Sequence, residues 1–241
     1  MPKYTIEDIK FGTDKGIFDR AVRLYEGGKV TRFCELVDGH SAVVLGTSSY
    51  EVFVSARGFD RGYCTCYLGE QDTLCKHMVA VAMRAAVGGK PLSAKDKKRA
   101  DEVVSSGRKG ELNKTELSAA KKKITAALRY IKSYDGPSRT WFAYQDSLLE
   151  GRRRLSAVFS DLPVSRQTAK FVVDTLVRID EKLSRGGVDD SDGTVGNLIV
   201  ASVDMLKEYA KIEPKCAEAF RILEGRSTMF DWEEPLLKLI D

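Results

Sequence analysis

The pattern of apolar and polar residues changes once along the chain, near residue 90. Before this point, short apolar runs alternate with turn residues, and the runs are 30–37, 41–46 and 50–56. Asp38-Gly39 and the segment 47–49 separate them, and both connections have the length and composition of hairpin turns. The pattern therefore predicts an antiparallel β-meander, with a helix over 14–25 before it and an apolar helix over 76–87 after it.

From Pro91 onward, apolar residues recur every three to four positions and strand patterns fade, which predicts an all-helical region. A polar, basic segment over 93–106 is either a helix or a linker. Helices are then expected over 115–133, from 138 to about 159, from a cap at Ser165 to 183, from a cap at Thr194 to about 211, over 214–225 and over 234–240. The fold class is therefore α+β, with regions 1–90 and 91–241.

The chain has 241 residues, of which 43% are hydrophobic, and this is enough to form a core. No run approaches the roughly 20 apolar residues that a membrane helix needs. The N-terminal sequence MPKYTIEDIKFG has no apolar stretch of the signal-peptide type. These features predict a soluble, cytoplasmic protein without a membrane partner.

The net charge of +4 is unevenly distributed along the chain. Residues 84–132 hold 14 basic and 5 acidic side chains, a net charge of +9, whereas residues 174–241 hold 9 and 15, a net charge of −6. Such a basic stretch can track phosphates, although a charged amphipathic helix is also the usual way to build a solvated surface. The candidate nucleic-acid contacts are Lys97, Lys98, Arg99, Lys121, Lys122, Lys123, Arg152, Arg153 and Arg154.

Three of the five cysteines lie within twelve residues, together with one of the two histidines. They form the pattern Cys64-Thr65-Cys66, eight further residues, then Cys75-Lys76-His77. Residues i and i+2 of an extended segment share one face, and a helix start favours thiolates, so both pairs can reach one ion. Three sulfurs and an imidazole complete a tetrahedral shell without an open position, which predicts structural zinc as the cofactor.

The remaining cysteines and the second histidine are expected to be structural. Cys34 and Cys216 stand alone in the sequence and are predicted to be small buried residues. His40 falls beside the Asp38-Gly39 turn and is predicted to lie on the surface.

The run CTCYLGEQDTLCKHMVAVAM, after the strand Tyr50-Glu51-Val52-Phe53-Val54, resembles the SWIM zinc-finger family over about residues 29–87. This resemblance implies a ββα metal module, centred on about 50–87, and a binding role toward DNA or protein. The segment Gly187–Gly193 is also similar to part of the helical tails of some bacterial SWIM proteins, which look like stacked helix pairs.

The acidic loop Asp189–Asp192 does not fit a calcium-binding EF-hand, because Val188 and Ile199 occupy the positions that need acids. It is expected to cap the following helix, and a docking loop for a basic partner is the alternative.

No phosphate-binding loop, Gly-x-Gly-x-x-Gly or Gly-x-Ser-x-Gly motif is present, so the expected role is non-enzymatic and has no small-molecule substrate. Two functions remain open. The protein binds DNA or RNA, or recruits partners within a nucleic-acid-processing complex, or it is a protein-interaction adaptor without nucleic-acid contact.

Overall fold

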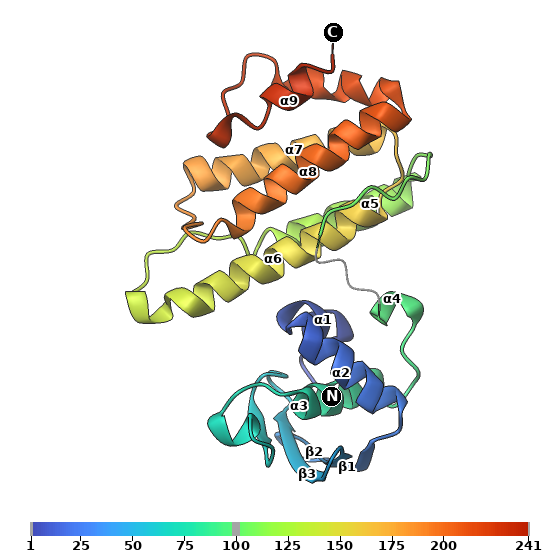
Figure 1. Ribbon diagram of the computed structural model, residues 1–241, viewed down its shortest axis with the longest axis vertical. Helices are drawn as coiled ribbons and strands as arrows, with labels where there is room; N and C mark the ends of the chain where they lie inside the picture. The colour runs from blue at the N-terminus through green and yellow to red at the C-terminus, as the bar shows by residue number, and fades with distance from the viewer. Residues whose placement is uncertain (1, 98–101, 241) are drawn as a thin grey trace. The chain divides into compact units, whose positions relative to one another are not determined.

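The computed structural model describes residues 2–97 and 102–240, and the chain divides into two compact units (Figure 1). The N-terminal unit is Met1–Arg99 and the helical unit is Ala100–Asp241. An α+β unit followed by helices confirms the predicted fold class. No helix within the described residues is long and apolar enough to cross a membrane.

The N-terminal unit is a four-stranded antiparallel sheet in sequential order with helices on one face. Its elements are α1 Ile6–Gly12, α2 Lys15–Glu26, β1 Val30–Glu35, β2 Gly39–Leu45, β3 Ser49–Ser55, β4 Gly62–Cys64, η1 Gly69–Gln71, α3 Lys76–Val87 and α4 Ala94–Lys97. The sheet and α3 bury one shared core, in which Phe18, Val54 and Val79 are fully inaccessible. Alternate residues of β3 point into this core, as the period-two pattern predicts.

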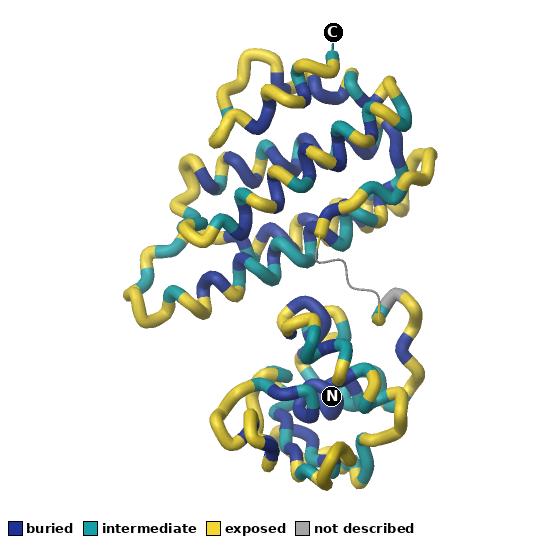
Figure 2. Tube along the Cα trace, in the orientation of Figure 1, coloured by how far each residue is buried: buried dark blue, intermediate teal, exposed yellow. Residues whose placement is uncertain are grey.

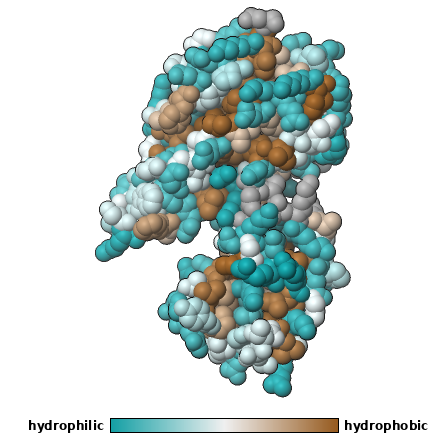
Figure 3. All heavy atoms as spheres, in the orientation of Figure 1, coloured by the Kyte–Doolittle hydropathy of each residue, from teal (hydrophilic) through white to brown (hydrophobic). Residues whose placement is uncertain are grey.

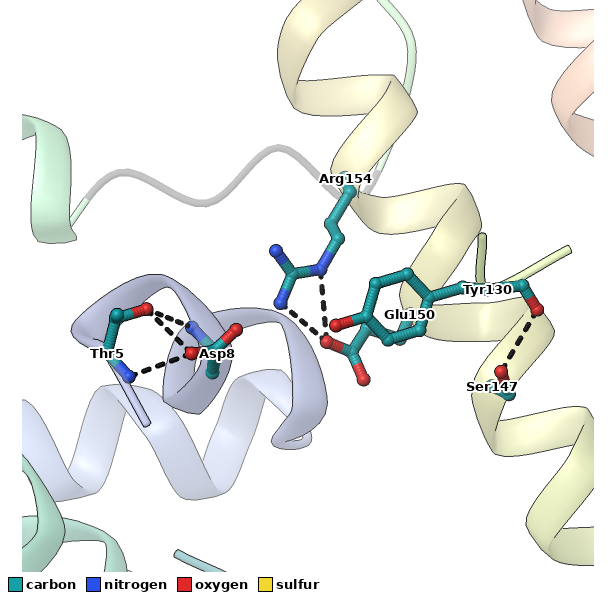
Figure 4. Close-up of polar contacts among 6 residues, drawn as sticks. All are labelled: Thr5, Asp8, Tyr130, Ser147, Glu150 and Arg154. Atoms are coloured by element: carbon teal, nitrogen blue, oxygen red, sulfur yellow. Dashed lines mark hydrogen bonds and ion pairs between the residues drawn. The ribbon is translucent and has the colours of Figure 1, made fainter. Parts of the chain in front are cut away.

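Helix α1 and strand β4 were not predicted from the apolar pattern. Helix α1 is short, and a capping box starts it: the Asp8 backbone N–H donates to the Thr5 hydroxyl, and the Asp8 carboxylate accepts from the Thr5 backbone N–H (Figure 4). Strand β4 has only three residues, which is too short to show an alternating pattern. Its pairing with β3 places Cys64 opposite Val52, so this strand positions the first of the clustered cysteines.

Residues just after 90 pack with the N-terminal unit, although the predicted regions divide at 90–91. The Tyr25 hydroxyl donates to the carbonyl of Lys90, and Leu92 is buried in the N-terminal core. Lys97 Nζ lies 2.7 Å from Glu26 Oε1. The segment 93–97 therefore belongs to this unit, and only its short stretch α4 is helical.

The helical unit is built from successive layers, which Figure 1 shows as α5 with α6, then α7 with α8, then the C-terminal segment. Its elements are α5 Lys114–Ala127, η2 Ser138–Thr140, α6 Trp141–Asp161, α7 Arg166–Ser184, α8 Thr194–Ile212, η3 Pro214–Leu223, η4 Met229–Asp231 and α9 Glu234–Leu237. Figure 2 shows buried positions repeating along the long helices. Ile124, Leu155, Leu176 and Leu206 belong to one contiguous core.

The end of α5 and the form of the segment after Pro214 differ from the prediction. Helix α5 ends at Ala127, about six residues early, because the chain tightens there and the N–H of Tyr130 donates to the carbonyl of Ala127. The end of α5 lies against α6 at Gly151, where a Cβ atom would come within 3.0 Å of Ile131 and Tyr130. The segment from Pro214 is helical, but it has the tighter 3₁₀ form.

The acidic loop before α8 is a cap. The Asp190 carboxylate accepts from the N–H groups of Val195 and Gly196, and the Asp192 carboxylate accepts from the N–H of Thr194. Thr194 is therefore the first helical residue and not the cap as predicted. Asp189 accepts from the indole N–H of Trp141 at 2.9 Å. These carboxylates are satisfied within the protein, which supports the capping interpretation.

The C-terminal segment is fixed to α7 by a buried carboxylate. Asp180 Oδ1 accepts from Trp232 Nε1 at 2.9 Å and from the N–H of Met229 at 2.8 Å. Trp232 is only 4% exposed, so it packs as expected and does not serve as an exposed anchor for a partner.

On the face drawn in Figure 3, hydrophilic and apolar residues are interspersed.

We expect a fragment of residues 102–241 to fold alone, because its helices share a core of their own. Circular dichroism should show helix and cooperative thermal unfolding. A fragment starting at Leu112 should unfold at a temperature lower by roughly 5–10 °C, because it lacks Val103, which is buried in this core, and the Ser106 hydroxyl that donates to the Leu162 carbonyl. An unfolded 102–241 fragment would show that the two units depend on each other.

Candidate metal centre

The four predicted zinc ligands converge at the junction of β4 and α3. Cys64 ends β4, Cys66 lies two residues on, Cys75 precedes the first turn of α3 and His77 lies within that turn. All four side chains are buried. One donor atom of each lies within 4.8 Å of the others, and no other group of this kind occurs among the described residues.

The donor distances fit a tetrahedral zinc ion. His77 Nδ1 lies 3.7 Å from Cys64 Sγ and 3.9 Å from Cys75 Sγ. Two donors bound at about 2.1–2.3 Å and separated by the tetrahedral angle would lie roughly 3.6–3.8 Å apart. His77 Nδ1 therefore lies at close to the ligand spacing of a zinc site from both Cys64 and Cys75. When bound, zinc supplies a charge that offsets the thiolates and a cross-link between strand and helix.

A hydrogen bond between two of the thiols shifts their pKa values in opposite directions. The Cys64 thiol donates toward Cys75, and the start of α3 adds the backbone N–H of Met78, so the pKa of Cys75 falls to about 4. The pKa of Cys64 is raised because this thiol is the donor and because it is buried. One thiolate thus forms readily without metal, while a second needs a cation beside it.

The backbone fits closely around the cysteines. The N–H of Gly69 donates to Cys66 Sγ at 3.4 Å. A Cβ atom on Gly69 would lie 2.1 Å from the carbonyl oxygen of Cys64, so any larger residue would displace the chain. The loop between the two ligand pairs can therefore fold back over the site only with glycine at this position.

The imidazole ligand is held by an aromatic neighbour. The Tyr50 ring stacks on His77 with 4.3 Å between centroids and 23° between planes. The Tyr50 hydroxyl is itself hydrogen-bonded to Thr47 Oγ1 at 2.9 Å. Tyr50 begins the strand motif that precedes the cysteines, so this strand helps to orient the fourth ligand.

Two predictions about the other cysteines and histidine were wrong. Cys34 is exposed, because it lies on the β1 strand where the register with β2 shifts. His40 is buried within β2 and stacks on Phe33 at 5.6 Å, and burial lowers its pKa. Strand β2 begins at Gly39, which draws His40 out of the turn and into the sheet. Cys216 is buried, as predicted.

The predicted nucleic-acid contacts differ in their exposure and in whether their charge is paired. Lys97 is paired with Glu26, while Lys98 and Arg99 lie outside the described residues. Arg152 and Arg153 on α6 are half-buried. Arg154 lies 2.7 Å from Glu150 and over the ring of Tyr130, as Figure 4 shows, so its charge is largely offset there.

Lys121, Lys122 and Lys123 are exposed on α5, and the structure adds cations that the sequence analysis did not name. Lys114 and Arg129 are also exposed, at positions seven or eight residues from Lys121 and Lys122. We call the surface formed by Lys114, Lys121, Lys122 and Arg129 the cationic face. Among the described residues, none of these four forms an ion pair.

A strand, a cysteine-rich turn and a helix that together offer four buried donors to one ion are the parts of a zinc-finger module. Residues 50–86 match the family model of the SWIM zinc finger, so the predicted finger is confirmed. The match covers the strand with Tyr50, all four ligands and most of α3. No curated protein and no solved structure matches the chain.

We expect one zinc ion per chain by elemental analysis. Cys64→Ser or His77→Ala should release it and unfold the N-terminal unit, since structural zinc contributes on the order of 10 kcal/mol in small fingers. Cys34→Ser is the matched control and should retain zinc, because Cys34 is exposed and outside the cluster. Full zinc content in Cys64→Ser would contradict the ligand assignment.

Acidification should release the metal, because protons compete for the three thiolates. Bound metal holds the thiol pKa values below those of the unfolded chain, so its contribution to stability is present at neutral pH and is lost as the pH falls. A zinc-sensitive dye should report release together with loss of strand signal. Zinc that stays bound after the N-terminal unit has unfolded would argue against this coupling.

Proposed function

We propose that the protein binds nucleic acid, with the zinc finger as a structurally fixed head and the cationic face of α5 as the main phosphate-contacting surface. The single observation that carries this proposal is the cationic face itself. Three exposed cations on α5 and Arg129, two residues beyond its end, have no acidic partner among the described residues. Such a surface attracts a polyanion and releases its counterions.

The zinc centre is not proposed as the phosphate site. Three thiolates around a divalent ion leave the site with a net charge of about −1, which does not attract phosphate. Its four donors are buried and complete a tetrahedral shell, so the proposed role is structural and non-enzymatic. A structural zinc centre and a separate phosphate-contacting surface are also compatible with recruitment within a nucleic-acid-processing complex.

A second candidate function, a protein-interaction adaptor, is favoured by exposed aromatic residues on the finger. Tyr67 is 74% exposed and Tyr63 is 55% exposed, and Tyr63 stacks beside Phe53 with ring centroids 5.9 Å apart. Exposed tyrosines on a rigid module are enriched at protein interfaces, because they contribute area at low entropic cost.

Lys122→Glu tests the nucleic-acid proposal, and Lys123→Glu is its matched control. Both residues are exposed on α5, but Lys123 lies outside the cationic face. We expect Lys122→Glu to weaken binding severalfold and to lower the slope of log affinity against log salt by about 0.9 for duplex DNA. Lys123→Glu should change affinity less than twofold. Fluorescence anisotropy with a labelled oligonucleotide between about 50 and 200 mM salt measures both quantities.

Equal effects of the two substitutions would show that the cationic face is not the contact surface. If the wild-type protein binds neither duplex nor single strand at low salt, the nucleic-acid proposal fails. The adaptor proposal then makes its own prediction. A Tyr63→Ala/Tyr67→Ala variant that keeps its zinc should lose protein partners that Lys122→Glu retains.

A further inference from the structure

Two shallow hollows meet on the surface of the helical unit. The first has a volume of about 390 Å³ and is lined by Ser118, Lys121, Lys122, Thr125, Ala126 and Arg129. The second has a volume of about 260 Å³ and lies between α5 and α7, lined by Lys121, Ile124, Thr125, Phe171, Asp174, Thr175 and Arg178. Because Lys121 and Thr125 line both, the two hollows adjoin each other on the surface.

The two hollows differ in chemistry. The first is lined by three cations and by the small residues Ser118 and Ala126 with Thr125, so an anionic group can approach the helix closely. The second is lined in part by the half-buried ring of Phe171, which also packs against the core of the unit. Two cations also line the second hollow, Lys121 of α5 and Arg178 of α7.

The one acid that lines the second hollow is already neutralised. Asp174 lies 2.7 Å from Lys170 Nζ on the same helix. Arg178 is exposed and forms no ion pair with a described residue. The rim of the second hollow is therefore net positive, while part of its lining is apolar and includes an aromatic ring.

A phosphate suits the first hollow and a flat, partly apolar group suits the second. One nucleotide of a single strand offers both groups side by side. In a duplex, the bases are stacked inside and the sugar-phosphate backbone faces outward, so a duplex can use the cations but cannot reach Phe171 with a base. Aromatic rings and guanidinium planes are the side chains on which unpaired bases stack.

We propose that the hollow between α5 and α7 receives a base of a single-stranded nucleic acid whose phosphates lie on the cationic face. This inference rests on the proposed function and names its ligand class. Phe171 supplies the stacking surface, and Arg178 contacts the base or the next phosphate. Lys121, which lines both hollows, holds the connecting backbone.

The test compares a labelled 20-nucleotide single strand with a duplex of the same sequence, using the full-length zinc-loaded protein. We expect the single strand to bind about tenfold more tightly at moderate salt. Phe171→Leu keeps an apolar side chain but removes the aromatic face. It should weaken single-strand binding severalfold and leave duplex binding unchanged. Phe142→Leu, at an exposed ring on α6, is the matched control and should change neither.

Arg178→Gln should likewise weaken single-strand binding more than duplex binding. Arg185→Gln, an exposed arginine at the end of the same helix, serves as its control. Thermal unfolding monitors whether each variant remains folded. DNA and RNA versions of the single strand separate the two sources of the ligand, because only RNA carries the 2′-hydroxyl.

A photo-crosslinking oligonucleotide that carries 5-iodouracil gives a direct readout. The crosslinked peptide should contain Phe171. Equal affinity for single strand and duplex, or crosslinks confined to the zinc finger, would overturn the base site while the proposed function stands. Absence of any binding would instead remove the proposed function together with this inference.

Discussion

The N-terminal unit depends on one electrostatic constraint: three thiols and an imidazole buried within 4.8 Å of one another require a cation between them. Burying more than one thiolate without such a charge costs free energy. If the thiols were protonated instead, the three sulfurs and the imidazole would be buried without the ion that they can bind. A zinc ion bound by these four side chains removes this cost and links β4 to α3. The helix closes the core over the sheet, so coordination and core packing are parts of one folding event.

The helical unit has a different basis for its stability. Its helices bury a contiguous apolar core, and carboxylates accept backbone and side-chain hydrogen bonds that hold its segments in place. Asp180 ties the C-terminal segment to α7, and Asp190 caps α8. These two acidic residues therefore stabilise the fold, whereas the lysines of α5 are exposed at the surface. This separation is the physical reason that the proposed contact surface lies on the helical unit and not on the finger.

The zinc site could be predicted from the sequence because its ligands are close together and chemically distinctive. The long helices could be predicted because their apolar periods extend over several turns. Short elements were missed, since β4 has three residues and α1 depends on the Thr5 capping box. Whether Cys34 and His40 are exposed or buried depends on strand register, which no local sequence pattern determines. Likewise, the sequence did not show that Arg129 and Arg178 lie near the lysines of α5, because this proximity depends on how the helices end and pack.

The placement of the five cysteines gives the protein an internal reporter. Only Cys34 is exposed, Cys216 is buried in the helical core, and the other three are the ligands. A thiol-specific reagent should therefore modify a single cysteine rapidly in the zinc-loaded protein. Chelation of the metal would open three more sites to the reagent, and full denaturation would add the last. The stepwise mass gain under alkylation would thus count metal-free molecules in a mixture, without any measurement of the metal itself.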